Sequence, residues 1–154
     1  MPKPPLRRWL RAWGLSVGAA VLLTALATGV YVVSQSQLMG FGTPIPFAEK
    51  PLSLMARQFA GGLLWGGAAG LLFAVPGVMA ALGVAALWWD SFAKAPWWIW
   101  TVLGAGFGAL LALPIFGAAT GFFAETVAIL AGGAALQIAR RRLRGAPNTL
   151  PTPS

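Results

Sequence analysis

The feature that most restricts the fold of this chain is a long run of uncharged residues, 59–89. An α-helix rises about 1.5 Å per residue, so this run would extend about 46 Å as one helix. About 20 apolar residues are enough to cross the hydrocarbon core of a membrane, which is about 30 Å thick. The run therefore predicts a membrane-spanning helix that is longer than the membrane requires.

Three shorter apolar runs accompany it. Charged residues make up 9% of the chain, against about 25% in soluble domains, so a soluble fold would expose large apolar patches to water. We therefore expect an all-α integral membrane protein, a four-transmembrane-helix bundle. Its expected helices cover residues 13–33, 59–89, 97–116 and 122–139.

The expected transmembrane domain, 13–139, lies between two basic segments. Residues 1–12 form a basic cytoplasmic segment, and residues 140–154 combine a basic stop-transfer signal with a proline-rich tail that we expect to be disordered. Residues 34–58 form the outer loop, and its last part, from residue 52 on, has the pattern of a short interfacial helix.

Pro76, followed by Gly77, leaves two arrangements open for the second helix. It is either one long helix kinked at Pro76 or a pair of short segments that turn there. The distribution of basic residues favours the single helix. If the second apolar run crosses the membrane once, the chain crosses four times in all. Nine of its eleven Lys and Arg residues then lie on the cytoplasmic side, and two, Lys50 and Arg57, lie outside. Five crossings would divide them four against seven, which fits the positive-inside rule less well.

The first apolar run also resembles a secretory signal, because a basic stretch and an apolar stretch precede Ala25-Leu26-Ala27. Apolar residues continue beyond that site to Val33. We therefore expect a retained membrane anchor rather than a cleaved signal, with both ends of the chain in the cytoplasm.

Tryptophan and arginine cluster where this topology places the cytoplasmic interface. Indole rings prefer the headgroup level of a membrane, and arginines there can contact anionic headgroups. We expect the lipid bilayer, with its anionic headgroups, to be one partner of the chain. The expected interface anchors are Trp88, Trp89, Trp97, Trp98, Arg140, Arg141, Arg142 and Arg144.

Glycine and alanine recur at intervals of four residues along the expected helices, which lets helix backbones approach closely in lipid. Such faces can pack inside this one bundle or can dock another membrane subunit, and the sequence leaves both interpretations open. The residues of these helix-packing or partner interfaces are Gly62, Gly66, Gly70, Gly104, Gly108, Ala124, Ala128 and Gly132.

Glu125 is an acidic residue a short way inside the fourth apolar run. It shares a helix face with Ala128 and Gly132, so we expect its side chain to point at another helix rather than at lipid. A carboxylate inside a membrane needs a partner, a proton or water. We interpret Glu125 as a structural contact, with an ion or proton site as the alternative.

The chain contains no Cys and no His. Disulfides, histidine-ligated haem, cysteine-held iron–sulfur clusters and catalytic pairs of a nucleophile with histidine are therefore excluded. We expect no enzyme activity, no catalytic residue, no cofactor and no bound metal. The net charge of +8 is concentrated beside apolar runs, so we expect no nucleic-acid partner either.

One segment, Gly42–Glu49 with the second apolar run after it, loosely resembles the part that leads into the second helix of small subunits of tripartite secondary transporters. Those subunits also have four helices and a similar length. The polar residues expected after that helix are absent here, where the chain stays apolar to Trp89. The resemblance supports only an alternative function, and no residue role follows from it.

We expect a small non-catalytic accessory or structural subunit of a larger membrane complex, in an energy-conversion, secretion or transport assembly. Its partners would be other integral membrane subunits. The alternative is a small component of a secondary transporter, or a homo-oligomeric pore in which Glu125 lines the path. The preference for Arg over Lys and the richness in Gly, Ala, Leu and Trp are typical of GC-rich bacteria. We therefore expect the chain in a bacterial inner membrane.

Overall fold

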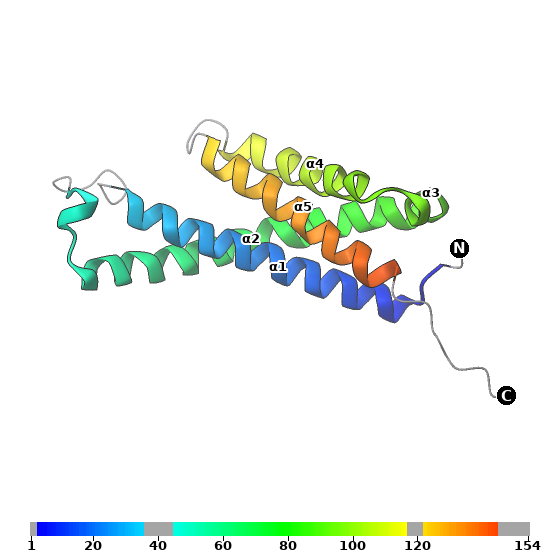
Figure 1. The fold of residues 1–154 in the computed structure, drawn as a ribbon, viewed down its shortest axis with the longest axis horizontal. Helices are drawn as coiled ribbons and strands as arrows, with labels where there is room; N and C mark the ends of the chain where they lie inside the picture. The colour runs from blue at the N-terminus through cyan, green and yellow to red at the C-terminus, as the bar shows by residue number, and fades with distance from the viewer. Residues whose placement is uncertain (1–2, 36–44, 117–121, 145–154) are drawn as a thin grey trace.

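The computed structural model describes residues 3–35, 45–116 and 122–144, which are helical apart from short connections (Figure 1). No strand is present in these ranges, which confirms the expected all-α class. The helices are α1 (Leu6–Ser34), the 3-10 turn η1 (Phe47–Glu49), α2 (Leu52–Leu87), α3 (Trp89–Lys94), α4 (Trp97–Phe116) and α5 (Phe122–Arg144).

Helix α2 runs without interruption from Leu52 to Leu87, so the second apolar run is one helix and is not broken at Pro76. Pro76 has no N–H, so it removes one hydrogen bond from the interior of the helix without ending it. The interfacial helix expected from residue 52 on forms the first turns of α2. No glycine or proline lies between Pro51 and Phe59 to end the helix there.

Helices α1 and α5 are longer than the apolar runs that predicted them. α1 begins directly after Pro5 and therefore includes Arg7, Arg8 and Arg11. α5 continues through Arg144. Arginine is a good helix former, so the charges end the apolar run without ending the helix.

The four long helices form two antiparallel hairpins, α1 with α2 and α4 with α5, which α3 joins at one end (Figure 1). The sequence predicted only a loop where α3 lies. α1 begins and α5 ends at this same end, which brings together basic clusters from opposite ends of the chain. We call it the basic end, and its exposed basic residues include Arg7, Arg8, Arg11, Lys94, Arg141 and Arg142.

Close contact between small residues holds each hairpin together. Gly62 of α2 lies so close to α1 that an added Cβ would stand 2.7 Å from the Cα of Gly29. In the second hairpin, an added Cβ on Gly104 would collide with the carbonyl of Gly132, and an added Cβ on Gly132 would collide with the carbonyl of Gly104. Removing these side chains lets the backbones touch, which is how helices gain van der Waals contact in lipid.

The buried core is concentrated in the half of the bundle next to the basic end. Trp100 is completely buried there, and Trp89 is only 3% exposed. The hydroxyl of Ser16 in α1 donates a hydrogen bond to the carbonyl of Ala135 in α5 (2.8 Å), which ties one hairpin to the other. Alanines that are at most 1% exposed fill the remaining space: Ala12, Ala81, Ala85, Ala135 and Ala139.

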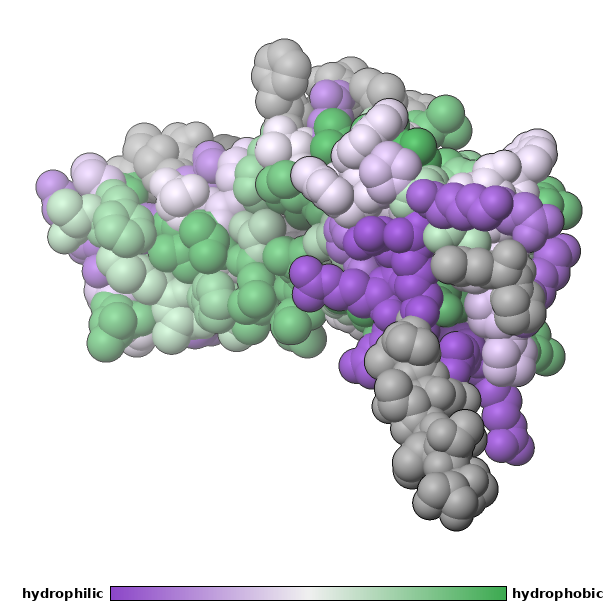
Figure 2. Space-filling model, turned by 45° about the vertical axis from the view of Figure 1, so that its right-hand side comes forward, coloured by the Kyte–Doolittle hydropathy of each residue, from purple (hydrophilic) through white to green (hydrophobic). Residues whose placement is uncertain are grey.

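Two helices, α1 and α2, are long and apolar enough to cross a membrane, judged by their length and composition. Only 28% of the apolar window of each is buried within the chain, whereas a core helix of a soluble domain would be mostly covered. Figure 2 shows hydrophobic residues over the part away from the basic end and hydrophilic residues gathered near that end. This distribution supports association with a membrane.

Candidate functional site

Away from the basic end, α2 and the second hairpin separate and leave an apolar groove of about 1070 Å³. Its lining comes from residues 20–35 of α1, 54–81 of α2, 104–111 of α4 and 123–136 of α5. We call this end of the molecule the groove end. Pockets for small molecules usually measure about 300–1000 Å³, so this groove has room for an elongated partner.

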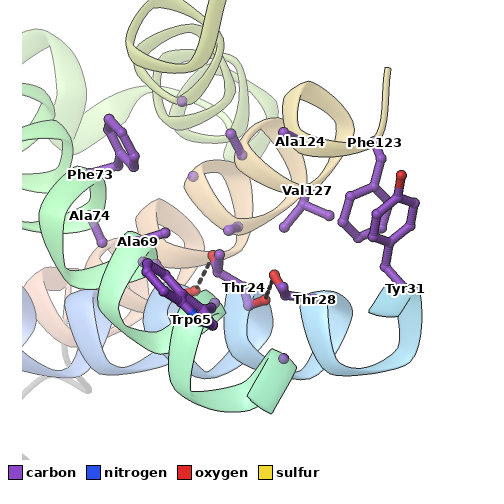
Figure 3. Close-up of a pocket in the computed structure, with 18 of the residues that line it drawn as sticks. Thr24, Thr28, Tyr31, Trp65, Ala69, Phe73, Ala74, Phe123, Ala124 and Val127 are labelled. Atoms are coloured by element: carbon purple, nitrogen blue, oxygen red, sulfur yellow. Dashed lines mark hydrogen bonds between the residues drawn. The ribbon is translucent and has the colours of Figure 1, made fainter. Parts of the chain in front are cut away.

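The walls of the groove carry aromatic and small side chains. Trp65 and Phe73 project from α2, and Ala124 and Val127 of α5 lie across from them (Figure 3). Trp65 is 71% exposed, so its ring stands in the open part of the groove and does not fill it. The walls therefore suit an apolar partner.

Helix α1 forms the floor, and its hydroxyl groups are already satisfied. Thr24 donates to the carbonyl of Ala20 (2.9 Å), and Thr28 donates to the carbonyl of Thr24 (2.8 Å), both within α1 (Figure 3). Threonine in an apolar helix commonly bonds to its own backbone in this way. Gly66 of α2 lies directly on Thr28, with an added Cβ only 2.6 Å from the Cβ of Thr28, so the floor is closed.

Polar side chains gather at the outer rim of the groove. Gln35, Arg57 and Gln58 line it there, and we call these three residues the mouth. Beside them, the ring of Tyr31 stacks on that of Phe123, with centroids 4.1 Å apart and planes inclined by 16° (Figure 3). This stack joins α1 to α5 at the rim, so the groove opens between α2 and the second hairpin.

Lys50, shortly before α2, supports the mouth from behind. It is 6% exposed, and its ammonium donates to the carbonyl of Val33 (2.7 Å), the carbonyl of Gln35 and Oε1 of Gln58 (3.1 Å). Three acceptors match the three N–H groups of an ammonium. The two carbonyls belong to the C-terminal end of α1, where the helix dipole favours a cation. Lys50 thus ties the end of α1 to the start of α2.

The small residues predicted as packing or partner interfaces lie between helices of this one chain or beside the groove. Those of α2 face α1, and those of α4 and α5 face one another, apart from Ala124 on the groove wall. All eight of these residues also line the groove, so the arrangement is compatible with packing inside one bundle and with docking of a partner. The α2 set is Gly62, Gly66 and Gly70, and the α4–α5 set is Gly104, Gly108, Ala128 and Gly132.

Glu125 lies in the first turn of α5 and is half-buried. Its neighbours Ala124 and Val127 line the groove, but Glu125 does not. The side chain of Glu125 is therefore not part of the groove.

The tryptophans predicted as interface anchors fall into two groups. Trp88, Trp97 and Trp98 are 58%, 60% and 52% exposed at the basic end. Trp89, in contrast, is buried against Trp9, with ring centroids 5.5 Å apart in an edge-to-face arrangement. Because α3 begins between Trp88 and Trp89, the two rings point to different sides. Trp89 therefore packs the core instead of presenting its ring at the surface as predicted.

Arg144, also predicted as a lipid anchor, turns back onto the protein. Its Nη2 donates to the carbonyls of Phe92 (2.9 Å) and Ala95, at the end of α3. Burial, and to a lesser extent the charge of Arg140, lowers the pKa of the Arg144 guanidinium. In the described residues, the buried Nε atoms of Arg140 and Arg144 have no hydrogen-bond partner. Arg144 thus serves as a cap for α3.

Sequence reasoning did not predict the groove or the residues at its mouth. Two signals pointed toward it. Arg57 and Gln58 stand immediately before the charge-free run, so they mark a polar end on an apolar helix. Of the eight tryptophans, Trp65 is the one that the expected topology places away from the cytoplasmic interface, and it stands in the groove.

Neither metal ligands nor relatives point to a particular chemistry. The described residues contain no group of three or more His, Cys, Asp or Glu side chains that could hold a metal ion. Comparisons with protein-family models, curated proteins and solved structures found no match to this chain. The groove and its mouth are therefore the features on which a function can be argued.

Proposed function

We propose that this chain is a small non-catalytic accessory subunit of a larger membrane assembly, and that the groove takes up an apolar component of the membrane, either a helix of another subunit or a lipid that lies between subunits. The observation that supports the proposal is the groove itself, about 1070 Å³ of apolar space between two hairpins that the chain does not fill. Aromatic walls left open in this way favour contact with another apolar surface.

In this proposal the bundle crosses a bacterial inner membrane four times, with both termini in the cytoplasm. α1 and α2 have the length and composition of spanning helices, and α4 and α5 form a second hairpin beside them. The basic end then faces the cytoplasm and its anionic headgroups, while Lys50 and Arg57 lie outside. This orientation follows the positive-inside rule.

The lining of the groove favours binding over catalysis. Catalytic acid–base work needs titratable groups within reach of a substrate. The described lining contains no Asp or Glu, and the hydroxyls of Thr24 and Thr28 bond to their own helix. In the pore alternative, the path that Glu125 lines would lie between copies of the chain and outside the groove.

The test is purification of the tagged chain from its native membrane in mild detergent, followed by mass spectrometry of the proteins that stay bound. Ala69→Trp places a large ring in the groove, and Leu72→Trp places the same ring on a side chain that is 68% exposed and outside the groove. We expect stoichiometric membrane proteins with the wild type and with Leu72→Trp, and their loss with Ala69→Trp. A chain that purifies only with copies of itself would contradict the proposal.

A further inference from the structure

The groove is polar at one end only. Gln35, Arg57 and Gln58 form its mouth, and the next lining residues along α2 are glycine or apolar as far as Ala81. A partner that fits both parts must itself be amphipathic, with a polar group at one end and an apolar body.

The apolar part of the lining continues to Ala81, about 36 Å from Arg57 along α2, so it is longer than one leaflet of a membrane and has room for the acyl chains of a lipid. Along α2, Arg57 and Phe73 are separated by about 24 Å at 1.5 Å per residue. A bilayer is about 40–45 Å thick with its headgroup regions, so one leaflet measures about 20–22 Å. A lipid with its headgroup at Arg57 therefore ends its acyl chains near Phe73.

The mouth also has a positive charge available for a ligand. Lys50 lies behind it, but all three of its N–H groups have protein acceptors. Arg57 is exposed, and within the described ranges its guanidinium has no hydrogen-bond or ion-pair partner. A guanidinium presents N–H groups in a fork that fits two oxygens of a phosphate.

We propose that the groove holds a membrane phospholipid with an anionic headgroup, whose phosphate contacts Arg57 and whose acyl chains lie between α2 and α5. This inference rests on the proposed membrane location and names the component that fills the groove. A transmembrane helix would also cover the apolar walls, but it would pair with Arg57 only if it carried an acidic residue at that level, whereas every phospholipid carries a phosphate in its headgroup. The charge of Arg57 at the mouth, together with that of Lys50 behind it, favours an anionic lipid over a zwitterionic one.

The experiment uses the full chain in its native membrane with the photoreactive residue benzoylphenylalanine at position 65. Trp65 lines the groove, whereas its neighbour Leu64 is 76% exposed and outside the groove, so position 64 samples bulk lipid. After irradiation, the adducts at both positions are identified by mass spectrometry. We expect anionic phospholipid to be enriched about fivefold at position 65 over position 64. This ratio corresponds to the binding free energy of about 1 kcal/mol that one basic residue contributes near anionic headgroups.

Variants of the mouth complete the test. Arg57→Gln should remove the enrichment, Arg57→Lys should retain most of it, and Arg141→Gln at the basic end should leave it unchanged. Equal lipid composition at positions 65 and 64 would overturn the lipid assignment. A protein adduct at position 65 would also overturn it, yet would support the accessory-subunit proposal, because the groove would then hold a helix of another subunit.

Discussion

The two ends of the bundle contain similar residues but pack them differently. At the basic end, Ala135 is completely buried, whereas Ala69 at the groove end is only half-buried on an open wall. Between the hairpins the basic end has the large rings of Trp89 and Trp100, together with the hydrogen bond from Ser16. Small residues therefore bring two helices of one hairpin together, whereas the space between the hairpins is filled only at the basic end. At the groove end, the stacked rings of Tyr31 and Phe123 join α1 to α5 but leave α2 open to the groove.

The largest expected difference between the two ends is their side of the membrane. The chain has no cysteine, so Ser53→Cys, beside the groove end, and Ser91→Cys, at the basic end, each introduce a single thiol. A membrane-impermeant maleimide added to intact cells should label the first and not the second, because the proposed topology of four crossings puts the two positions on opposite sides. Permeabilised cells, in which both should react, are the control. Labelling of Ser91→Cys in intact cells would show that the orientation is inverted or that the chain does not cross the membrane four times.

Replacing an alanine with leucine should destabilise the chain at the basic end and have little effect at the groove end. Ala135→Leu forces three more carbon atoms into a filled core and should lower the free energy of unfolding by about 1–3 kcal/mol. Ala69→Leu extends into the groove and should change it by less than about 0.5 kcal/mol. Titration with sodium dodecyl sulfate, followed by the circular dichroism signal of the helices, measures the free energy of unfolding of both variants. Equal destabilisation would mean that the groove end is packed as tightly as the basic end.

At the groove end, the largest single contribution should come from Lys50. Lys50→Met keeps the apolar stem but leaves the carbonyls of Val33 and Gln35 without their cation, at a cost of about 1–2 kcal/mol. Hydrogen exchange of the last turn of α1 should become faster. Lys94→Met, an exposed change at the basic end, is the matched control and should not alter that exchange. Unchanged exchange in Lys50→Met would show that this contact does not hold α1.

The smallest effect is expected from Ser16→Ala. It removes one hydrogen bond between the hairpins, to the carbonyl of Ala135, and should lower the free energy of unfolding by about 1 kcal/mol. Thr28→Ala, whose hydroxyl bonds only within α1, should have a smaller effect in the same titration. If Thr28→Ala lowered the free energy of unfolding more than Ser16→Ala, the hydrogen bond between the hairpins would not stabilise the basic end.

Much of the helical pattern was predictable, because it depends on local chemistry. The run 59–89 has no charge, and its glycines recur at a spacing that packs one face against another helix, as Gly62 does against Gly29. The ends of helices were less predictable. Arg144 continues α5 beyond its apolar run, since a charge does not stop a helix.

The groove was not predictable, because it depends on how two hairpins are inclined to one another. Residue spacing along α2 says which side chains share a face, but not whether that face meets α4 or stays open. The role of Lys50 was hidden for the same reason. In the sequence it is a charge in a loop, and only the fold brings the end of α1 and Gln58 around it.

The most direct test of the open groove end is disulfide formation between paired cysteines in the native membrane. An added Cβ on Gly67 lies 4.0 Å from the Cβ of Ala25, within the range of about 3.5–4.5 Å that disulfides require. Ala25→Cys with Gly67→Cys, inside the first hairpin, should therefore cross-link readily on mild oxidation. Ala69→Cys with Ala124→Cys, on facing walls of the groove, should remain reduced under the same conditions. Efficient cross-linking of that second pair would show that the hairpins close on one another and would contradict the account.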